Sequence, residues 1–330
     1  MVTSWPKGLP GVGTGAERLA QRITDMSGGR LTVKVYAAGE IVPALECFSA
    51  VAEGKAEMGH DASYYHIGKH RQAPFFTAVP FGLTANEMSG WVNYGGGQAL
   101  WDELYAGFGL KPFLAGNTGT QMLGWYRKEL KTADDYKGLK VRMPGLGGEV
   151  VKRLGATVVG LPGGEIFQAL QNGTVDAAEW VGPYNDQALG LNQVAEYYYG
   201  PGFQEPSAAL ELLINKKLYE ELPKDLQAIV AAAAQAAYDD QWAEYSLRNG
   251  EALANLIAKG TKVSRVPNEL MVALGNASGE LLAEERDKAD AVGKKIFESY
   301  LKYRAPLSAY TRIGEQAMTN ARALAYKYVE

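Results

Sequence analysis

The sequence predicts an α/β protein built as two lobes, and three observations support this. Strand-like runs alternate with helical runs over the first two thirds of the chain, which is typical of a mostly parallel sheet. The strand–helix–strand rhythm that follows Gly39-Glu40-Ile41 recurs loosely after Gly164-Glu165-Ile166, although the distances to the next glycine differ, 15 residues against 9. We interpret this echo as two lobes on similar plans, with a chance match as the alternative. Lastly, a helical run from Pro223 to about Lys259 measures about 50 Å at 1.5 Å per residue, enough to lie along both lobes.

The first lobe is predicted over residues 1–115, together with part of 207–260. The capping box Thr14-Gly-Ala-Glu17 predicts the start of a helix that closes at Gly28-Gly29. A second box, Thr84-Ala-Asn-Glu87, predicts a helical run to about Phe108 with a break at Gly95-Gly96-Gly97. Residue periodicity predicts the other elements: strands over 31–36, 56–59 and 110–114, and a helix over 43–53.

The second lobe is predicted over residues 116–206 and repeats the alternation. The last third, 207–330, begins with a strand over 208–214 and continues with the long helix. Helical sequence dominates from Pro267, with an interruption near Arg304-Ala-Pro306. Within the second lobe we expect strands over 138–142, 156–161 and 175–181, and helices over 148–154 and 163–172.

Composition narrows the class of protein. The chain has 330 residues, 47% of them hydrophobic and 21% charged, which indicates a folded globular protein. Its net charge of −4 argues against nucleic acid as a partner, because that binding depends on neutralising phosphates. The lone cysteine, Cys47, excludes an internal disulfide and is interpreted as a buried thiol.

The sequence contains neither a membrane-spanning apolar run nor a signal peptide, since Met1 leads directly into Val2-Thr-Ser-Trp-Pro6. This leaves two possibilities open: a cytoplasmic protein, or one whose leader was removed or lies outside this sequence.

Motifs of common enzymes are missing from the sequence. There is no Gly-x-Ser-x-Gly elbow, Walker loop or Cys-x-x-Cys, and two glycine-rich stretches fail the dinucleotide-binding register. His66 and His70 have the spacing of two metal ligands on one helix face, but neighbouring glycines favour a loop. We therefore interpret His60, His66 and His70 as ordinary polar histidines, with metal binding as the minor alternative.

Two predicted strand ends carry the chemistry of a small-molecule site. Lys140-Val-Arg142 ends before Met-Pro-Gly, and Asp176-Ala-Ala-Glu179-Trp180 ends a strand 37 residues beyond that arginine. Ligands of open α/β sheets bind at the carboxyl ends of strands. The planar guanidinium of Arg142 suits a carboxylate, with an internal salt bridge to a nearby acid as the alternative. Trp180 supplies an aromatic wall.

A cation is the second predicted component of this site. Asn117-Thr-Gly-Thr-Gln121 follows the sheet of the first lobe, and Gln204-Glu205 begins the last third. A ligand carboxylate on Arg142 would be repelled by Glu179 and Glu205 unless a cation lay among them. Amide, carboxylate and backbone oxygens suit Na⁺ or Ca²⁺, and such an ion would also chelate the 2-oxygen of a 2-oxo or 2-hydroxy acid.

A family resemblance accompanies these residues and extends over nearly the whole chain. The sequence resembles the substrate-binding proteins of tripartite ATP-independent periplasmic (TRAP) transporters, in particular the branch that binds 2-oxo acids and lactate. The motifs that carry the resemblance are Pro80-Phe-Gly-Leu-Thr84, Tyr94-Gly-Gly-Gly97, Gly116-Asn-Thr-Gly119, Gln121-Met-x-Gly-Trp125, Val141-Arg-Met-Pro-Gly-Leu-Gly-Gly148, Leu161-Pro-Gly-Gly-Glu-Ile166, Asp176-Ala-Ala-Glu-Trp-Val-Gly-Pro183 and Gln204-Glu-Pro206.

The resemblance implies a two-lobed periplasmic solute-binding protein fold with hinge strands and a long helix that spans both lobes. It implies a periplasmic location, delivery to a TRAP membrane permease and, in this branch, a homodimer through C-terminal helices. It also implies that the lobes close on a carboxylate held by Arg142, with Na⁺ or Ca²⁺ bound alongside. The implied cation ligands are Gln121, Glu179, the Trp180 backbone and Glu205; the organic acid would be lined by Asn117, Gln121, Trp180, Tyr65 and Asn185.

The sequence thus predicts a receptor, not an enzyme, for a small pyruvate-like 2-oxo monocarboxylate. A receptor for lactate or a C4 dicarboxylate is the first alternative. A metal-assisted enzyme with Glu179 or Glu205 as base is the second, and a sugar- or amino-acid-binding protein of another transport class is the third.

Overall fold

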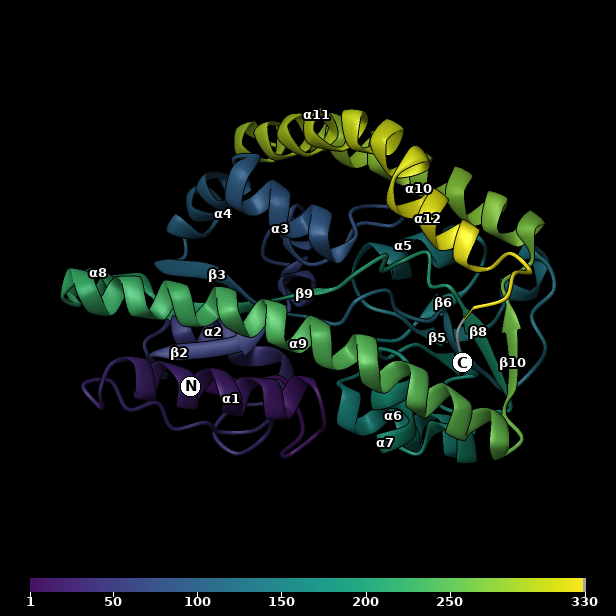
Figure 1. The fold of residues 1–330 in the computed structure, drawn as a ribbon, viewed down its shortest axis with the longest axis horizontal. Coiled ribbons are helices and arrows are strands. Elements are labelled where there is room, and N and C mark those ends of the chain that lie inside the picture. Colours follow the sequence, from purple (N-terminus) through teal and green to yellow (C-terminus); the bar gives the residue numbers. More distant parts are fainter. Residues whose placement is uncertain (329–330) are drawn as a thin grey trace.

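The computed structural model describes residues 1–328 and contains two β-sheets within them (Figure 1). The first sheet has the order β1-β2-β9-β3, and the second has the order β10-β8-β4-β7-β5-β6. We call each sheet with its covering helices a lobe. The first sheet comprises β1 (Val2–Thr3), β2 (Met58–Asp61), β9 (Ala209–Asn215) and β3 (Leu110–Asn117). The second comprises β10 (Lys262–Arg265), β8 (Tyr197–Gly200), β4 (Gly124–Tyr126), β7 (Ala177–Ala178), β5 (Lys140–Arg142) and β6 (Thr157–Val158).

The helices pack around these sheets. Figure 1 shows α1 beside the first sheet, and α3 and α4 between that sheet and the C-terminal helices. The helices of the first two thirds are α1 (Val12–Met26), α2 (Cys47–Ala52), α3 (Ala85–Tyr94), α4 (Gly97–Ala106), α5 (Gly145–Arg153), α6 (Ile166–Gln171) and α7 (Pro183–Ala188). Those of the last third are α8 (Lys216–Glu221), α9 (Lys224–Ala258), α10 (Asn268–Lys288), α11 (Ala291–Ile313) and α12 (Glu315–Arg322).

Helix α9 confirms the predicted spanning element. It contacts β3 and α1 of the first lobe and α7 of the second, and Figure 1 shows it running along both. The chain also crosses between the sheets where β3 leads to β4 and where β8 leads to β9. These two crossings lie side by side, since Asn117 pairs with Ala209 and the Thr118 amide donates to the Ala208 carbonyl at 3.1 Å. We call these two crossings the hinge.

Each lobe has its own aromatic centre. In the first, Phe76 stacks on Trp91 and Trp101 with ring centroids 5.3 and 4.8 Å apart. In the second, Trp125 stacks on Tyr198 at 4.1 Å. Such ring pairs add to the free energy of burial and fix the relative orientation of the side chains in each lobe.

The prediction of a mostly parallel sheet is confirmed for β5, β6 and β7, which pair in parallel, whereas one strand in each sheet runs in the reverse direction. Strand β9 runs antiparallel to β2 and β3, and β4 runs antiparallel to β7 and β8. The reason is the hinge: a chain that passes from one sheet to the other and back must reverse its direction. The strands β4, β8 and β10 were not predicted from the sequence.

Three predicted boundaries are wrong. Residues 31–36 form only a single bridge, Val2 to Tyr36, because β1 is two residues long and offers few partners. Helix α1 begins before Thr14, since the break is made by Gly11, whose φ of 74° favours glycine. Helix α11 runs through Pro306 to Ile313; the proline is exposed, so water can satisfy the carbonyl that it leaves without a donor.

The other helix predictions are confirmed. The second capping box forms, with the Thr84 amide donating to Glu87 Oε2 at 2.9 Å, and the break at Gly95-Gly96 separates α3 from α4. A search of the helices in residues 1–328 finds none with both the length and the apolar character needed to cross a membrane.

Candidate functional site

Arg142 and Glu179 meet at the predicted strand ends. Strand β5 pairs in parallel with β7, so Arg142 at the end of β5 lies beside the residues that follow Ala178. Arg142 Nη1 donates to the Glu179 carbonyl at 2.8 Å and forms an ion pair with Glu179 Oε1, while Nε donates to the Leu161 carbonyl at 3.0 Å. The internal salt bridge is therefore present, and it leaves the Nη2 end of the guanidinium for another partner.

Five buried polar atoms around this pair have no hydrogen-bond partner among residues 1–328. They belong to residues that are at most 3% exposed, on four separate segments of the chain. An unpaired buried polar atom costs about 1–3 kcal/mol, so such a cluster is unfavourable without a bound partner. The atoms are Gln121 Oε1, Arg142 Nη2, Glu179 Oε2, Trp180 Nε1 and Glu205 Oε2.

This site differs from an ordinary ion pair because a second buried carboxylate, that of Glu205, interacts with Glu179. Burial and the nearby charge of Glu179 raise the pKa of Glu205 well above its usual range, against the opposing effect of Arg142. Burial also raises the pKa of Glu179, although Arg142 lowers it. One guanidinium therefore does not stabilise two buried carboxylates. Three unpaired oxygens, two of them from carboxylates, are a donor set that fits Na⁺ or Ca²⁺.

Backbone hydrogen bonds hold the segments of the site together. The Gln121 amide donates to the Glu205 carbonyl at 3.1 Å, and the Gly202 amide donates to the Gln121 carbonyl at 2.8 Å. The Glu179 amide donates to the Arg142 carbonyl at 3.1 Å. Main-chain hydrogen bonds therefore join the two hinge crossings to each other and the two strand ends to each other.

Aromatic side chains close the site from both lobes. The Arg142 guanidinium carbon lies 5.3 Å from the ring centroid of Trp180. From the first lobe, Trp5 lies 6.3 Å from Trp180 and 6.4 Å from Tyr65, ring centroid to ring centroid. Burial raises the pKa of Tyr65 to about 12 while the Arg142 charge lowers it, so this tyrosine is a neutral hydroxyl near the guanidinium. Trp5 was not predicted, since nothing near it in the sequence marks it.

Asn117 and Asn185 lie at the junction of the lobes with their amides already engaged. Asn117 donates to the Tyr238 hydroxyl at 2.8 Å and accepts from the Gly119 amide at 2.7 Å. Asn185 donates to the Pro10 carbonyl and accepts from the Tyr245 hydroxyl. Both therefore differ from the five unpaired atoms, and Asn185 joins α7 to α9 and to the loop before α1.

The three histidines do not form a shared cluster. His60 Nδ1 accepts from the Trp5 indole at 2.7 Å, and His70 lies 3.3 Å from an Asp290 oxygen. His66 ends a short 3₁₀ helix, η2 (Ser63–His66), and contacts Asp61 and Glu211 instead. The minor alternative of a His66–His70 metal pair is therefore not formed.

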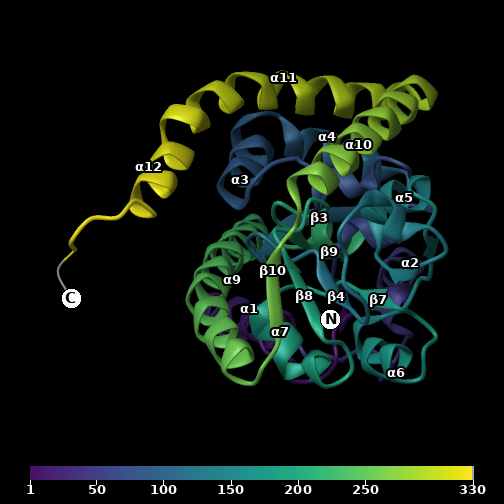
Figure 2. The ribbon, with the colours of Figure 1, turned by 90° about the vertical axis from the view of Figure 1, so that its right-hand side faces the viewer.

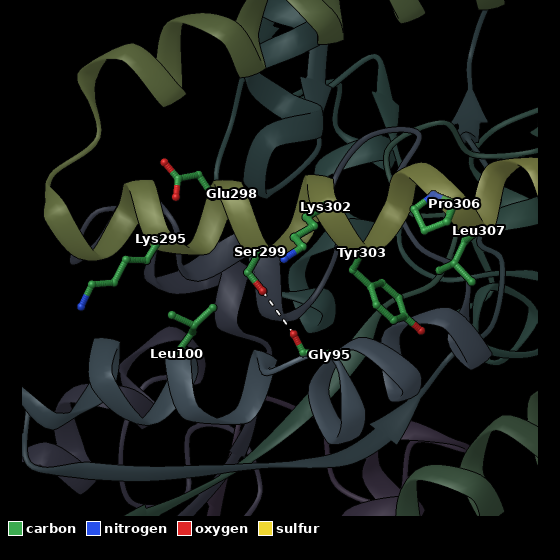
Figure 3. A pocket seen from close by; sticks show the side chains of 9 residues that line it. All are labelled: Gly95, Leu100, Lys295, Glu298, Ser299, Lys302, Tyr303, Pro306 and Leu307. Atoms are coloured by element: carbon green, nitrogen blue, oxygen red, sulfur yellow. Dashed lines mark hydrogen bonds between the residues drawn. The ribbon is translucent and has the colours of Figure 1, made fainter.

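A groove of about 660 Å³ between α4 and α11 lies away from this site (Figure 3). Leu100, Lys295 and Tyr303 line it, and Ser299 Oγ donates to the Gly95 carbonyl at 3.3 Å. It contains none of the predicted ligand-binding residues.

Comparisons with known proteins establish the family and the fold of the chain. Residues 1–288 match the family described as bacterial extracellular solute-binding protein, family 7. A relative in Nostoc sp., named a monocarboxylate 2-oxoacid-binding periplasmic protein, is 45% identical over 320 residues, covering 97% of this chain and 87% of the relative.

Solved structures share the fold. A TRAP transporter solute-binding protein from Bordetella bronchiseptica, with copurified calcium and picolinate, has a TM-score of 0.95 at 39% identity, with 98% and 96% of the two chains covered. A TRAP periplasmic solute-binding protein from Pseudoalteromonas atlantica, with bound sodium and pyruvate, has a TM-score of 0.93 at 40% identity, with 98% of each chain covered. The two-lobed periplasmic solute-binding protein fold is thereby confirmed.

Both the family match and the full-length similarity concern solute-binding proteins rather than enzymes. The chain therefore belongs to bacterial extracellular solute-binding protein family 7, the solute receptors of TRAP transporters.

Proposed function

We propose that this protein captures a small 2-oxo monocarboxylate together with Na⁺ or Ca²⁺ in the periplasm and delivers it to a TRAP permease. The observation that carries the proposal is the cluster of five buried, unpaired polar atoms between the lobes. The ligands named for the relatives, a monocarboxylate 2-oxoacid in one and pyruvate with sodium in another, support it.

In the proposed complex, the ligand carboxylate accepts from Arg142 Nη2. The cation is bound by Gln121 Oε1, Glu179 Oε2, Glu205 Oε2 and the Trp180 backbone, and it bridges the two glutamates to the ligand's 2-oxygen. Glu179 keeps its Oε1 on Arg142, so it would join the cation and the guanidinium. Tyr65 completes the lining of the acid. Asn117 and Asn185 would contribute indirectly, because their hydrogen bonds hold the hinge and the junction of the lobes in place.

The same charges favour a monocarboxylate over a C4 dicarboxylate. A second ligand carboxylate would enter a site that already holds Glu179 and Glu205, and Arg142 has a single free end. Trp5 packs against both Tyr65 and Trp180, and we expect these rings to restrict the length of the ligand's tail. An acid as short as pyruvate or lactate fits these walls best, and the keto oxygen suits a hard cation.

Closure of the lobes is proposed to bury the acid and the ion. The lobes would be residues 1–115 and 116–206, with 207–330 supplying the hinge strand, the spanning helix and the C-terminal helices. Ligand binding shifts the equilibrium toward the closed form by its differential affinity for the two states. The closed form would then dock on the permease.

Thermal unfolding with a ligand panel tests the proposal. Pyruvate, longer 2-oxo acids, lactate, a C4 dicarboxylate and a sugar are each added with and without Na⁺ or Ca²⁺. We expect a rise in the midpoint with one short 2-oxo acid that depends on the cation, because a ligand specific to the native state stabilises it. A rise with a dicarboxylate or sugar alone would contradict the proposed ligand class.

We also propose that two copies pair through their C-terminal helices. Large apolar side chains are exposed on the outer part of α11 and on α12, which extend away from the body in Figure 2. These are Tyr310, Ile313 and Met318. Sedimentation analysis of Ile313→Glu/Met318→Glu should give a monomer, whereas Leu247→Glu, an exposed leucine on α9, should keep the dimer. A wild-type monomer would refute this pairing.

A further inference from the structure

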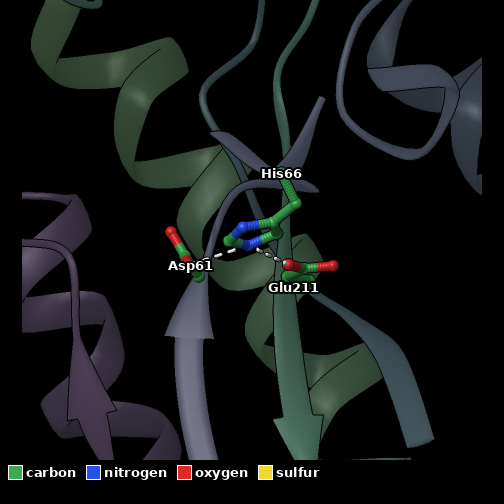
Figure 4. A group of neighbouring side chains, drawn as sticks. All are labelled: Asp61, His66 and Glu211. Carbon is green, nitrogen blue, oxygen red and sulfur yellow. Dashed lines mark ion pairs between the residues drawn. The ribbon is translucent and has the colours of Figure 1, made fainter. Parts of the chain in front are cut away.

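A second buried cluster of potential ligand atoms lies inside the first lobe. Asp61 ends β2 and lies directly opposite Glu211 of β9 in the antiparallel register, while His66 ends η2. His66 Nε2 lies 3.0 Å from Asp61 Oδ2 and 3.3 Å from Glu211 Oε1 (Figure 4). All three side chains are at most 4% exposed.

Hydrogen bonds fix the outer oxygen of each carboxylate. Asp61 Oδ1 accepts from Ser4 Oγ at 2.6 Å and from the Ala62 amide at 2.8 Å. Glu211 Oε2 accepts from Ser63 Oγ at 2.5 Å and from the Tyr105 hydroxyl at 3.0 Å. Each carboxylate is thereby held so that its other oxygen faces the imidazole. Metal ligands are commonly oriented by such a surrounding set of hydrogen bonds.

Direct contact among the three groups does not satisfy them. A single Nε2–H can point at one acceptor, yet Nε2 lies between two carboxylate oxygens. Although the distances are those of ion pairs, none of the three inner atoms makes a hydrogen bond of acceptable geometry within residues 1–328. An imidazolium with two carboxylates also leaves one net negative charge in the core, which is costly.

We propose that Asp61, His66 and Glu211 form a binding site for a divalent transition metal, with Zn²⁺ as the best fit. Bonds of about 2.1 Å at tetrahedral or octahedral angles place ligand atoms about 3.0–3.4 Å apart, which matches both measured distances. A divalent cation with a neutral imidazole and two carboxylates also leaves no net charge. All three inner atoms (Asp61 Oδ2, His66 Nε2, Glu211 Oε1) become satisfied at once.

This site differs in chemistry from the cation site of the proposed receptor function. That site offers oxygens alone, which suit Na⁺ or Ca²⁺, whereas an imidazole nitrogen selects transition metals. The ion would have a structural role. It joins β2, the hinge strand β9 and η2, and η2 carries Tyr65 at the ligand site. We therefore expect it to stabilise the first lobe and to leave the identity of the bound acid unchanged.

Nuclear magnetic resonance of the wild-type protein provides the first test. The chain has three histidines, so ¹⁵N-imidazole spectra resolve each one. Metal-free full-length protein is exposed to Zn²⁺ both in its native form and during refolding, because the site is buried. We expect one histidine, with Nε2 as ligand, to acquire a metal-bound shift at one equivalent. If all three spectra stay unchanged with ten equivalents, the cluster is an ion pair only and the proposal is wrong.

Variants test the assignment by equilibrium dialysis and metal analysis. His66→Gln should lose one Zn²⁺ per chain, and Asp61→Asn, which keeps an acceptor for Ser4, should weaken Zn²⁺ binding at least tenfold. The matched control is Glu205→Gln at the other cation site, which should keep this Zn²⁺. Zn²⁺ retained by both cluster variants but lost from Glu205→Gln would place the metal at the receptor site and overturn the proposal. Pyruvate binding in the presence of Na⁺ is measured separately, so the proposed Zn²⁺ site and the proposed receptor function can fail independently.

Discussion

Arg142 and Glu179 form a buried ion pair between the ends of two adjacent parallel strands, and one end of each group has no partner among residues 1–328. Breaking such a pair is costly because it leaves an uncompensated charge in the protein interior. The pair therefore serves two purposes in our account: it fixes both side chains, and it presents Nη2 and Oε2 to an acid and a cation.

Arg142→Lys should weaken binding of the 2-oxo acid at least tenfold, equivalent to about 1.4 kcal/mol. Lysine keeps the charge but cannot bind Leu161, Glu179 and a ligand through one planar group. Calorimetry measures the loss. The control is Arg153→Lys, which alters an exposed pair with Glu284 and should bind normally. Unchanged affinity in Arg142→Lys would reject the clamp.

Glu205→Gln should abolish the dependence of acid binding on the cation. The variant removes one of two buried carboxylates whose repulsion the ion is proposed to relieve, and a neutral amide binds Na⁺ or Ca²⁺ less strongly. Calorimetric titrations with and without the ion measure this response. Glu196→Gln, which disrupts an exposed pair with Lys262, is the control and should retain it. A full cation response in Glu205→Gln would remove Glu205 from the ion's ligands.

Gly163→Ala should displace Trp180 and weaken acid binding. A Cβ at residue 163 would lie 2.2 Å from Trp180 Cη2, so the indole must move, at a cost of about 1–3 kcal/mol in unfolding free energy. Tryptophan fluorescence, denaturant unfolding and calorimetry report the three effects. Gly164→Ala is the control, because its Cβ would meet nothing nearer than Pro6 Cγ at 3.6 Å. If Gly163→Ala and Gly164→Ala bind the acid equally well, the position of Trp180 does not control binding.

Because of His60, the free energy of unfolding should decrease as the pH is lowered from about 6.5 to about 4. Burial lowers the pKa of His60 from 6.5 to about 4, and its Nδ1 accepts from Trp5, so the folded state disfavours protonation. Since the unfolded state binds more protons in this range, linkage predicts a loss of up to about 3 kcal/mol at the lower limit.

Chemical denaturation at several pH values measures this effect as the difference between wild type and His60→Gln. The difference is needed to cancel the contribution of Asp186. Burial raises the pKa of Asp186 to about 6, so this residue increases the free energy of unfolding as the pH falls over the same range. Parallel stability curves for the two proteins would contradict the assignment to His60.

The sequence contained enough to predict the strand ends with Arg142 and Glu179, since local alternation and the Pro-Gly that follows Arg142 mark them. It left open whether the arginine forms a salt bridge, because that depends on the register of β5 against β7. Local patterns could not predict the reversed strands, which follow from the chain crossings between the lobes, or the position of Trp5, which follows from its contact with Trp180. Likewise, Asp61 and Glu211 are 150 residues apart in sequence and meet only through strand pairing.

Calorimetry of metal-free protein with pyruvate, with and without Na⁺ or Ca²⁺, tests the central claim most directly. Our account predicts stoichiometric binding that is at least tenfold tighter with one of these ions, because the ion relieves the repulsion between Glu179 and Glu205. Equal affinity after exhaustive removal of both ions, with ligand-free protein verified by mass spectrometry, would contradict it.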